Sequence, residues 1–328
     1  MRRTLTVLLL ALPTLATAAA PASAAKNRWI TGKTWVIAHQ GGEDEFPSNT
    51  LYAFKRAQRA GVDMLELDIG VTKDNQVIVM HDTTVDSKTN GRGEVRSFTL
   101  KQIQKLDGAY WFSPKAPHYD RTRPASAYPF RGIATGKRKP PKGYKASDFR
   151  VTTLAEVMKA FPRTPINIEI KGRTKQEAIA EYLYNARVLA KLLKASPRRD
   201  LIVVSFKQEA VDLFHQLAPK IPLAPGITGS ADFLLKKIRP TQGSVVFQLP
   251  VTYDYPGLGL VTVASKPFID AAHAGGYSWH VWFGDNDPDA PATWKNLVNL
   301  CVDGIMSARP VALQRFLKAN PSPAACRG

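Results

Sequence analysis

The sequence predicts an α/β protein with the architecture of a TIM (β/α)8 barrel, with a β-hairpin after the second strand and a capping insertion. Short apolar runs typical of strands alternate with amphipathic helical runs along the chain. Eight strand-like runs can be counted, which favours a closed parallel barrel over an open sheet. A doubly wound sheet is the alternative, but no GxGxxG motif opens a helix after a strand.

The barrel strands are expected where short apolar runs stand between turn residues. Between them lie helical segments, most clearly residues 50–60 and 176–194, where apolar residues recur at helical spacing. The expected strands are VIAH (36–39), MLELDI (64–69), INIEI (166–170), LIVVSF (201–206), LAPGI (223–227), VVFQL (245–249), SWHVW (278–282) and DGIMS (303–307).

A β-hairpin is expected directly after the second strand, where LELDIGVT and VIVMHD flank the residues KDNQ. Asp74 and Asn75 suit a tight two-residue turn. Counting back from this turn places His81 opposite Asp68. Because side chains alternate between the two faces of a strand, Glu66, Asp68 and His81 are expected to share one face.

A long irregular stretch, about residues 107–150, interrupts the alternation of strands and helices. It is rich in Tyr, Pro, Lys and Arg. Loops of this length without secondary structure are uncommon and are usually lids, subdomains or disordered segments. The many aromatic residues argue against disorder. We therefore expect a cap over the mouth of the barrel that selects the substrate.

Residues 1–24 have the pattern of a secretory signal peptide. A basic start precedes an apolar run over residues 5–20 and the small-residue cleavage motif ASA. A membrane anchor is the alternative, but the run is short and Pro13 interrupts it. We expect cleavage after Ala24 and a secreted protein in which residues 25–328 form one barrel domain.

The formal net charge of the chain is +18. A basic exported protein favours anionic partners, such as a small phosphodiester substrate, an anionic membrane surface or a cell-wall polyphosphate. Much of this charge is expected to belong to an ordinary solvated surface. Nucleic acid is not expected as a partner, because no stripe of Lys and Arg interleaved with aromatic residues stands out.

The chain contains two cysteines, Cys301 and Cys326. In an exported protein an even count allows one disulfide, with two separate thiols as the alternative. The loop before the last strand and the end of the last helix both lie at the bottom of such a barrel. We therefore expect a disulfide that holds the C-terminal tail away from the active site.

Ionisable residues follow several of the expected strands or lie on the hairpin. In parallel barrels the active site lies at the carboxyl ends of the strands, so these residues are expected to meet there. Each alone has an ordinary interpretation, such as a strand-end ion pair or a core histidine. Burying these charged groups together would cost free energy, through lost hydration and the repulsion between like charges, unless a cation and a phosphate lay between them. The residues are His39, Glu66, Asp68, His81, Glu169 and Lys171.

Three of these residues, Glu66, Asp68 and Glu169, are candidate metal ligands. Carboxylates from separate strands suit a hard divalent cation, because Ca²⁺ and Mg²⁺ prefer oxygen ligands. Zinc fits less well, because the group contains only two histidines and no cysteine. We expect one divalent cation, Ca²⁺ or Mg²⁺, as the cofactor.

A set of short motifs stands in order over about residues 34–318. They read His39-Gln40-Gly41, Pro47-Ser48-Asn49-Thr50, Glu66-Leu67-Asp68, His81-Asp82, Glu169-Ile170-Lys171, Val281-Trp282-Phe283 and Asp303-Gly304-Ile305. With these motifs the sequence resembles the glycerophosphodiester phosphodiesterase family, whose pattern is HRG, PENT, ExD, HD, ExK, a vWT-type strand and DGI. Gln40 stands in place of the family's arginine and Ser48 in place of its PENT glutamate, and Glu43 or Asp44 is a candidate replacement for the lost acid.

The resemblance implies hydrolysis of a glycerophosphodiester to glycerol 3-phosphate and an alcohol. The three acids would hold the metal, and Lys171 would help it to neutralise the phosphoryl oxygens. His39 is expected to be the general base and His81 the general acid, with water or a substrate hydroxyl as nucleophile. Further candidates for substrate contact are Gln40, Trp282 and Gln248.

Three alternatives stay open at this point. One is phospholipase D-like action on lysophospholipid or sphingomyelin, and another is hydrolysis of wall teichoic acid, a glycerophosphate polymer. The third is non-catalytic phosphate binding, which the residues Gln40 and Ser48 motivate. The pair His39 and His81 argues against simple binding, because binding requires no proton transfer.

Overall fold

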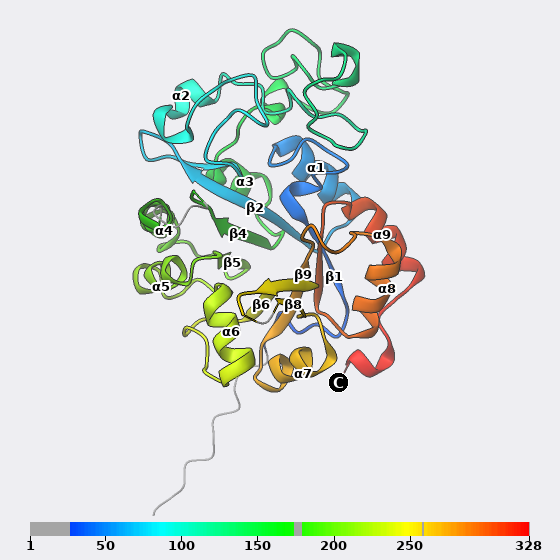
Figure 1. The fold of residues 1–328 in the computed structure, drawn as a ribbon. Coiled ribbons are helices and arrows are strands. Elements are labelled where there is room, and N and C mark those ends of the chain that lie inside the picture. Colours follow the sequence, from blue (N-terminus) through cyan, green and yellow to red (C-terminus); the bar gives the residue numbers. More distant parts are fainter. Residues whose placement is uncertain (1–26, 174–178, 258, 328) are drawn as a thin grey trace, which may run out of the picture.

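The computed structural model describes residues 27–173, 179–257 and 259–327, so the predicted signal peptide lies outside the described residues. Parallel strands form one curled sheet in the order β5-β4-β2-β1-β10-β9-β6, and β3 pairs with β2 in a hairpin (Figure 1). The strands are β1 Trp35–Ala38, β2 Met64–Val71, β3 Val77–Val79, β4 Ile166–Ile170, β5 Leu201–Val204, β6 Val246–Pro250, β9 Ser278–Trp282 and β10 Gly304–Ser307.

The two edges of this sheet are joined through Leu223, which lies in a segment that the sequence predicts as a strand. Leu223 forms a parallel bridge with Val203 of β5 and another with Ser244, just before β6. The barrel predicted from the sequence is therefore confirmed. The predicted strand 223–227 is much shorter than expected, because only isolated bridges form there.

Helices surround the sheet on its outer side (Figure 1). The predicted helix 50–60 is confirmed as α1. Thr50 caps its first turn by accepting a hydrogen bond from the amide of Ala53, and Gly61 ends it in the left-handed conformation. The helices are α1 Leu51–Ala60, α2 Leu100–Ile103, α3 Leu154–Ala160, α4 Ile179–Leu193, α5 Gln208–Leu217, α6 Ile227–Lys236, α7 Lys266–Ala274, α8 Pro291–Asn299 and α9 Pro310–Ala319.

Alternation along the strands divides the buried side chains between two cores. The larger core lies between the sheet and the helices and includes Val36 and Leu65. The smaller core includes Ile37 and Met64, their neighbours on the opposite face of the same strands. The alternate residues after Met64 therefore point toward the barrel interior, and two of them, Glu66 and Asp68, are acidic.

The hairpin after β2 is present, but its predicted register is wrong by one residue. Val71 pairs with Val77, and the amide of Met80 donates a 2.9 Å hydrogen bond to the carbonyl of Asp68. Met80, not His81, therefore lies opposite Asp68. The physical reason is a longer turn, in which Asn75 adopts the left-handed conformation with φ 60°.

Residues 107–150 pack against α1 and the loop before it (Figure 1). Phe149 stacks on Tyr52 of α1 with ring centroids 4.5 Å apart, and Phe112 and Tyr128 are fully buried. The insertion is therefore an ordered part of the domain with its own aromatic cluster.

A second hairpin, β7 Thr252–Tyr255 and β8 Gly259–Thr262, follows β6 and was not expected from the sequence. Its strands pair with each other and not with the barrel. Among the described residues, no helix is both long enough and apolar enough to span a membrane.

Cys301 and Cys326 form a disulfide with an S–S distance of 2.06 Å. Cys301 lies between α8 and β10, and Cys326 lies beyond α9. The bond therefore ties the C-terminal tail to the amino end of a barrel strand, which is the end away from the carboxyl rim.

Replacing both cysteines with serine should lower the free energy of unfolding by about 3 kcal/mol, because the disulfide restricts the unfolded chain. Urea unfolding of the wild type and the double variant measures this loss. Either single serine variant should lose about as much as the double variant. Loss of activity at 25 °C in a folded variant would contradict the placement of the bond away from the active site.

Candidate active site

Three carboxylates from two adjacent strands meet inside the barrel. Glu66 and Asp68 of β2 and Glu169 of β4 each offer an oxygen atom, and these atoms lie within 4.8 Å of one another. The pairing of β2 with β4 places Asp68 directly beside Glu169. Glu66 and Asp68 are 1% and 0% exposed. This acidic group could hold a divalent metal ion.

The charges within the acidic group are not balanced by the protein alone. Burial and the neighbouring charge of Asp68 raise the pKa of Glu66 to about 8. Burial opposes ionisation of Asp68 too, but Lys171, the two histidines and the hydrogen bond from Asn49 together outweigh burial and lower the pKa of Asp68. Asp68 Oδ1 lies 3.4 Å from Lys171 Nζ and forms no hydrogen bond with the described residues. A hard cation with oxygen ligands fits both the excess charge and this free oxygen.

Lys171 follows β4 and lies at the edge of the acidic group. Its Nζ is 2.8 Å from Glu169 Oε1, and the side chain is 15% exposed. Burial opposes its charge, but Glu169 and Asp68 outweigh burial and raise the pKa of Lys171. Lys171 is therefore a permanent cation on the wall of the cleft.

His39 directly follows β1 and is held by a carboxylate from its own loop. Its Nδ1 lies 2.8 Å from Glu43 Oε1, and its Nε2 lies 3.9 Å from Glu66 Oε2. Burial disfavours the imidazolium, but Glu43 and Glu66 outweigh burial and raise the pKa of His39 to about 10. Glu43 thus supplies a rim carboxylate in the loop where the family's PENT acid is missing.

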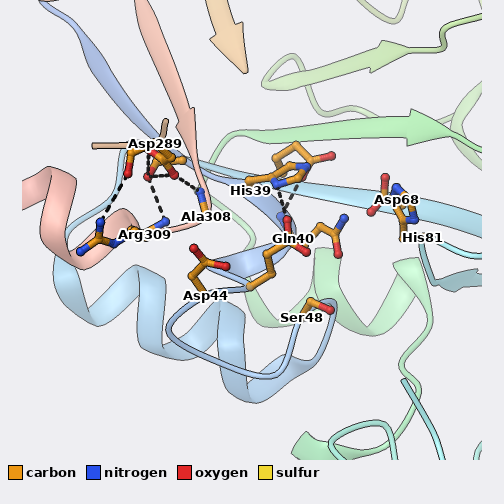
Figure 2. A network of polar contacts seen from close by, with 12 residues as sticks. His39, Gln40, Asp44, Ser48, Asp68, His81, Asp289, Ala308 and Arg309 are labelled. Atoms are coloured by element: carbon orange, nitrogen blue, oxygen red, sulfur yellow. Dashed lines mark hydrogen bonds and ion pairs between the residues drawn. The ribbon is translucent and has the colours of Figure 1, made fainter. Parts of the chain in front are cut away.

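His81 is held in a similar way by its neighbour in the sequence. Its Nδ1 lies 2.7 Å from Asp82 Oδ1, and Ser87 donates a hydrogen bond to the other oxygen of Asp82. Figure 2 shows His81 beside Asp68. Burial opposes its charge, but Asp68 and the bond to Asp82 raise the pKa of His81. Both histidines are thus fixed through Nδ1, which leaves Nε2 as the atom that can exchange a proton with a ligand.

Gln40 does not lie where the sequence prediction places it. Its side chain is 3% exposed and is not among the described residues that line the cleft. The residue has a left-handed backbone with φ 49°, which directs its amide to Glu66 Oε2 at 2.7 Å. Gln40 therefore contacts a candidate metal ligand through its backbone.

Two groups near the rim were missed by sequence reasoning. Asn49, within the PSNT motif, donates a 3.0 Å hydrogen bond to Asp68 Oδ2. Lys88 Nζ lies 3.5 Å from the ring centroid of Tyr119, whose hydroxyl donates to Ser48 Oγ at 3.0 Å. The motif itself could have pointed to Asn49, whereas no sequence signal marks Lys88.

Asp289 links the loop after β9 to the carboxyl end of β10 (Figure 2). Its carboxylate accepts hydrogen bonds from the Ser307 hydroxyl and the Ala308 amide, both at 2.8 Å. The carbonyl of Ala308 in turn accepts a 3.1 Å bond from the amide of Asp44. These bonds connect three rim loops, including the one that carries His39.

A cleft of about 710 Å³ opens beside the acidic group. Its lining includes His39, His81, Glu169 and Lys171, and also Trp282 and Gln248 as the sequence led us to expect. Trp282 stacks on Phe206 with ring centroids 5.4 Å apart. The amide of Gln248 is paired with Asn167 at 2.7 and 3.2 Å, so its hydrogen-bonding capacity is largely used inside the barrel.

A parallel barrel that joins an acidic group, a lysine and two carboxylate-bound histidines on one cleft has the features of an enzyme active site. Residues 39–312 match the Glycerophosphoryl diester phosphodiesterase family. The chain therefore belongs to this family.

Individual relatives agree with this assignment. The Bacillus subtilis protein YhdW is 35% identical over 191 residues, which are 58% of this chain and 64% of YhdW. The match thus covers less than two thirds of YhdW. A Bacillus subtilis glycerophosphodiester phosphodiesterase is 33% identical over 224 residues, 67% of this chain and 69% of that protein.

A solved structure supports the fold. The Oleispira antarctica phosphodiesterase, determined in complex with its product sn-glycerol-3-phosphate, superposes with a TM-score of 0.60 at 18% sequence identity. The match covers 87% of this chain and 97% of that one.

The acidic group can be tested by metal binding alone. Loss of a residue that only supports a metal ligand typically weakens metal binding by about 10- to 100-fold. Glu169→Gln should weaken Ca²⁺ or Mg²⁺ binding by more than this, because it removes a charged ligand. Titration calorimetry measures the change. Glu94→Gln is a matched control, since Glu94 is exposed and pairs with Arg173. Equal metal binding by both variants would contradict the assignment of Glu169 as a metal ligand.

Proposed function

We propose that the protein hydrolyses glycerophosphodiesters to glycerol 3-phosphate and an alcohol, using a divalent cation and histidine acid–base catalysis. The observation that carries the proposal is the acidic group beside two oriented histidines on one cleft, in a chain of this family. The relatives' names support the same reaction.

Glu66, Asp68 and Glu169 would hold the cation, which would polarise the phosphoryl oxygens when bound. Lys171 binds an anionic oxygen of the substrate from the side of β4. Gln40 and Asn49 hold the carboxylates in place through their bonds to Glu66 and Asp68.

His39 and His81 carry the proton transfers in this proposal. Binding of the cation to Glu66 would offset one of the negative charges that raise the pKa of His39, which would allow the ring to be neutral. His39 Nε2 would then remove the proton of the nucleophile, and Glu43 would stabilise the resulting imidazolium through Nδ1. His81, whose pKa is raised, protonates the oxygen of the leaving alcohol through Nε2. Asp82 fixes the orientation of that ring.

We also propose that the protein works outside the cytoplasm. The predicted signal peptide motivates this proposal, and the Cys301–Cys326 disulfide supports it, because disulfides persist in oxidising compartments. Detection of the cleaved chain in the culture medium, with Ala25 at its N-terminus, would support export. Retention of the intact chain inside cells would contradict it.

Activity on glycerophosphocholine should disappear in EDTA and return with Ca²⁺ or Mg²⁺, because EDTA removes the cation that the three carboxylates would hold. Release of choline, measured with and without chelator, tests this. Full activity after exhaustive dialysis against EDTA would refute the need for a metal ion. Binding of the diester without turnover under any metal would favour a non-catalytic phosphate-binding protein.

The two histidine roles can be separated by the leaving group. Choline needs a proton to leave and a nitrophenolate hardly does, while general acid catalysis is worth about 10²–10⁴-fold. His81→Ala should therefore cripple hydrolysis of glycerophosphocholine and largely spare a nitrophenyl diester. His39→Ala should damage both reactions, because the nucleophile must be activated in each.

Steady-state kinetics on the two substrates measures the difference. The opposite pattern would exchange the two roles. Equal losses on both substrates in both variants would show that the histidines bind substrate or metal and transfer no proton.

A further inference from the structure

The insertion 107–150 reaches the rim of the barrel through Tyr119, although it contributes no described residue to the lining of the cleft. The Tyr119 hydroxyl accepts a 2.8 Å hydrogen bond from the amide of Ser48 and donates a 3.0 Å bond to the Ser48 hydroxyl. Ser48 is 5% exposed, so these two bonds are largely shielded from water. Ser48 belongs to the first rim loop, residues 39–50, which also carries Gln40 (Figure 2).

The residue after Ser48 connects this contact to the acidic group. Asn49 donates a 3.0 Å hydrogen bond from its side-chain amide to Asp68 Oδ2. This bond holds the carboxylate so that Oδ1, which forms no hydrogen bond with the described residues, is the oxygen left for a cation. Asn49 is itself left-handed, with φ 57°. A left-handed residue other than glycine persists only where the surrounding structure holds it, so the Asn49 side chain depends on how its neighbours are fixed.

Tyr119 is fixed by its own surroundings. Its ring meets the ring of the fully buried Phe112 edge-on, with centroids 5.9 Å apart. Lys88 Nζ, from the segment after β3, lies 3.5 Å from the centre of the Tyr119 ring. The preceding residue, His118, has its Nε2 3.5 Å from Asp44 Oδ1 of the first rim loop. The insertion therefore presents the Tyr119 hydroxyl to this loop from a fixed position.

We propose that Tyr119 is a positioning residue, which acts through the PSNT motif on the candidate metal ligand Asp68. The inference rests on the proposed function, since Asp68 is one of the residues that would hold the cation. Groups that orient a metal ligand contribute to metal affinity, because a carboxylate held in place loses less freedom when the ion binds. In the family pattern a glutamate stands at position 48. Here Ser48 stands there, and the insertion contacts it from outside the cleft.

Tyr119→Phe removes the hydroxyl and keeps the ring against Phe112 and Lys88. The dissociation constant for Ca²⁺ or Mg²⁺, measured by titration calorimetry, should rise by about ten-fold, the lower end of the range for residues that support a metal ligand. Tyr144→Phe is the matched control, because the Tyr144 hydroxyl belongs to the same insertion and accepts a hydrogen bond from Arg59 near the other end of α1. Equal metal affinities of the two variants would overturn the proposal. A wild type that binds neither ion would instead overturn the metal site of the proposed function.

A double variant tests the route through Asn49. Asn49→Gly removes the bond to Asp68 and keeps a residue that tolerates the left-handed backbone. If Tyr119 acts through Asn49, the metal dissociation constant of the double variant should equal that of Asn49→Gly alone, because the hydroxyl no longer has a route to Asp68. A further loss of about ten-fold in the double variant would show independent effects and overturn this route.

Turnover of glycerophosphocholine separates metal affinity from a general loss of structure. The metal concentration that gives half of the maximal rate should rise by about ten-fold in Tyr119→Phe, and added metal should restore the rate. A loss of turnover that no metal concentration restores, at unchanged metal affinity, would overturn the positioning role. Absence of turnover in the wild type with either ion would overturn the proposed function.

Discussion

The burial of three carboxylates inside the barrel is the constraint on which the rest of the site depends. Glu66, Asp68 and Glu169 lie on strands whose pairing brings their oxygens within 4.8 Å of one another. Carboxylates removed from water at this spacing repel one another unless cationic groups and hydrogen-bond donors surround them. The neighbouring elements meet this need in part, since β4 supplies Lys171 and the loop after β1 supplies the Gln40 amide and Asn49.

The acidic group could be predicted because it follows from the alternation of side chains along strands. Glu66 and Asp68 are two residues apart in β2, so they must share a face, and Met64 two residues earlier belongs to the inner core. Glu169 comes from a strand that the sequence shows equally clearly. The strands and helices themselves were predicted from other signals, namely short apolar runs between turn residues and apolar residues at helical spacing.

The register of the hairpin could not be predicted so well, because it depends on the backbone of one turn residue. Asn75 adopts a left-handed conformation and lengthens the turn, which shifts the pairing by one residue. His81 still reaches the cleft, because β3 ends at Val79 and the chain is free of the strand alternation beyond it. The prediction of a shared face was thus reached from the wrong pairing.

The apolar residues that line part of the cleft could not be predicted from the sequence, for a different reason. Leu234, Tyr253 and Phe268 come from α6, β7 and α7, and in the sequence each is an ordinary apolar residue of a helix or strand. Only the tertiary arrangement shows that these side chains face a cavity and not one another. The insertion 107–150, which the sequence made the natural candidate for substrate selection, contributes no described residue to the lining.

The two departures from the family's motifs change the charge of the rim in opposite directions. Gln40 lacks a positive charge and Ser48 lacks a negative one, so the pair of replacements leaves the net charge of the rim unaltered. In this chain the Gln40 side chain is buried, and the Ser48 hydroxyl accepts a hydrogen bond from Tyr119 of the insertion. Glu43 provides the carboxylate that holds His39, and Lys171 remains the cation on the wall of the cleft. The charges that the proposed reaction needs are therefore present in this rim, although one of them comes from a different position in the first loop.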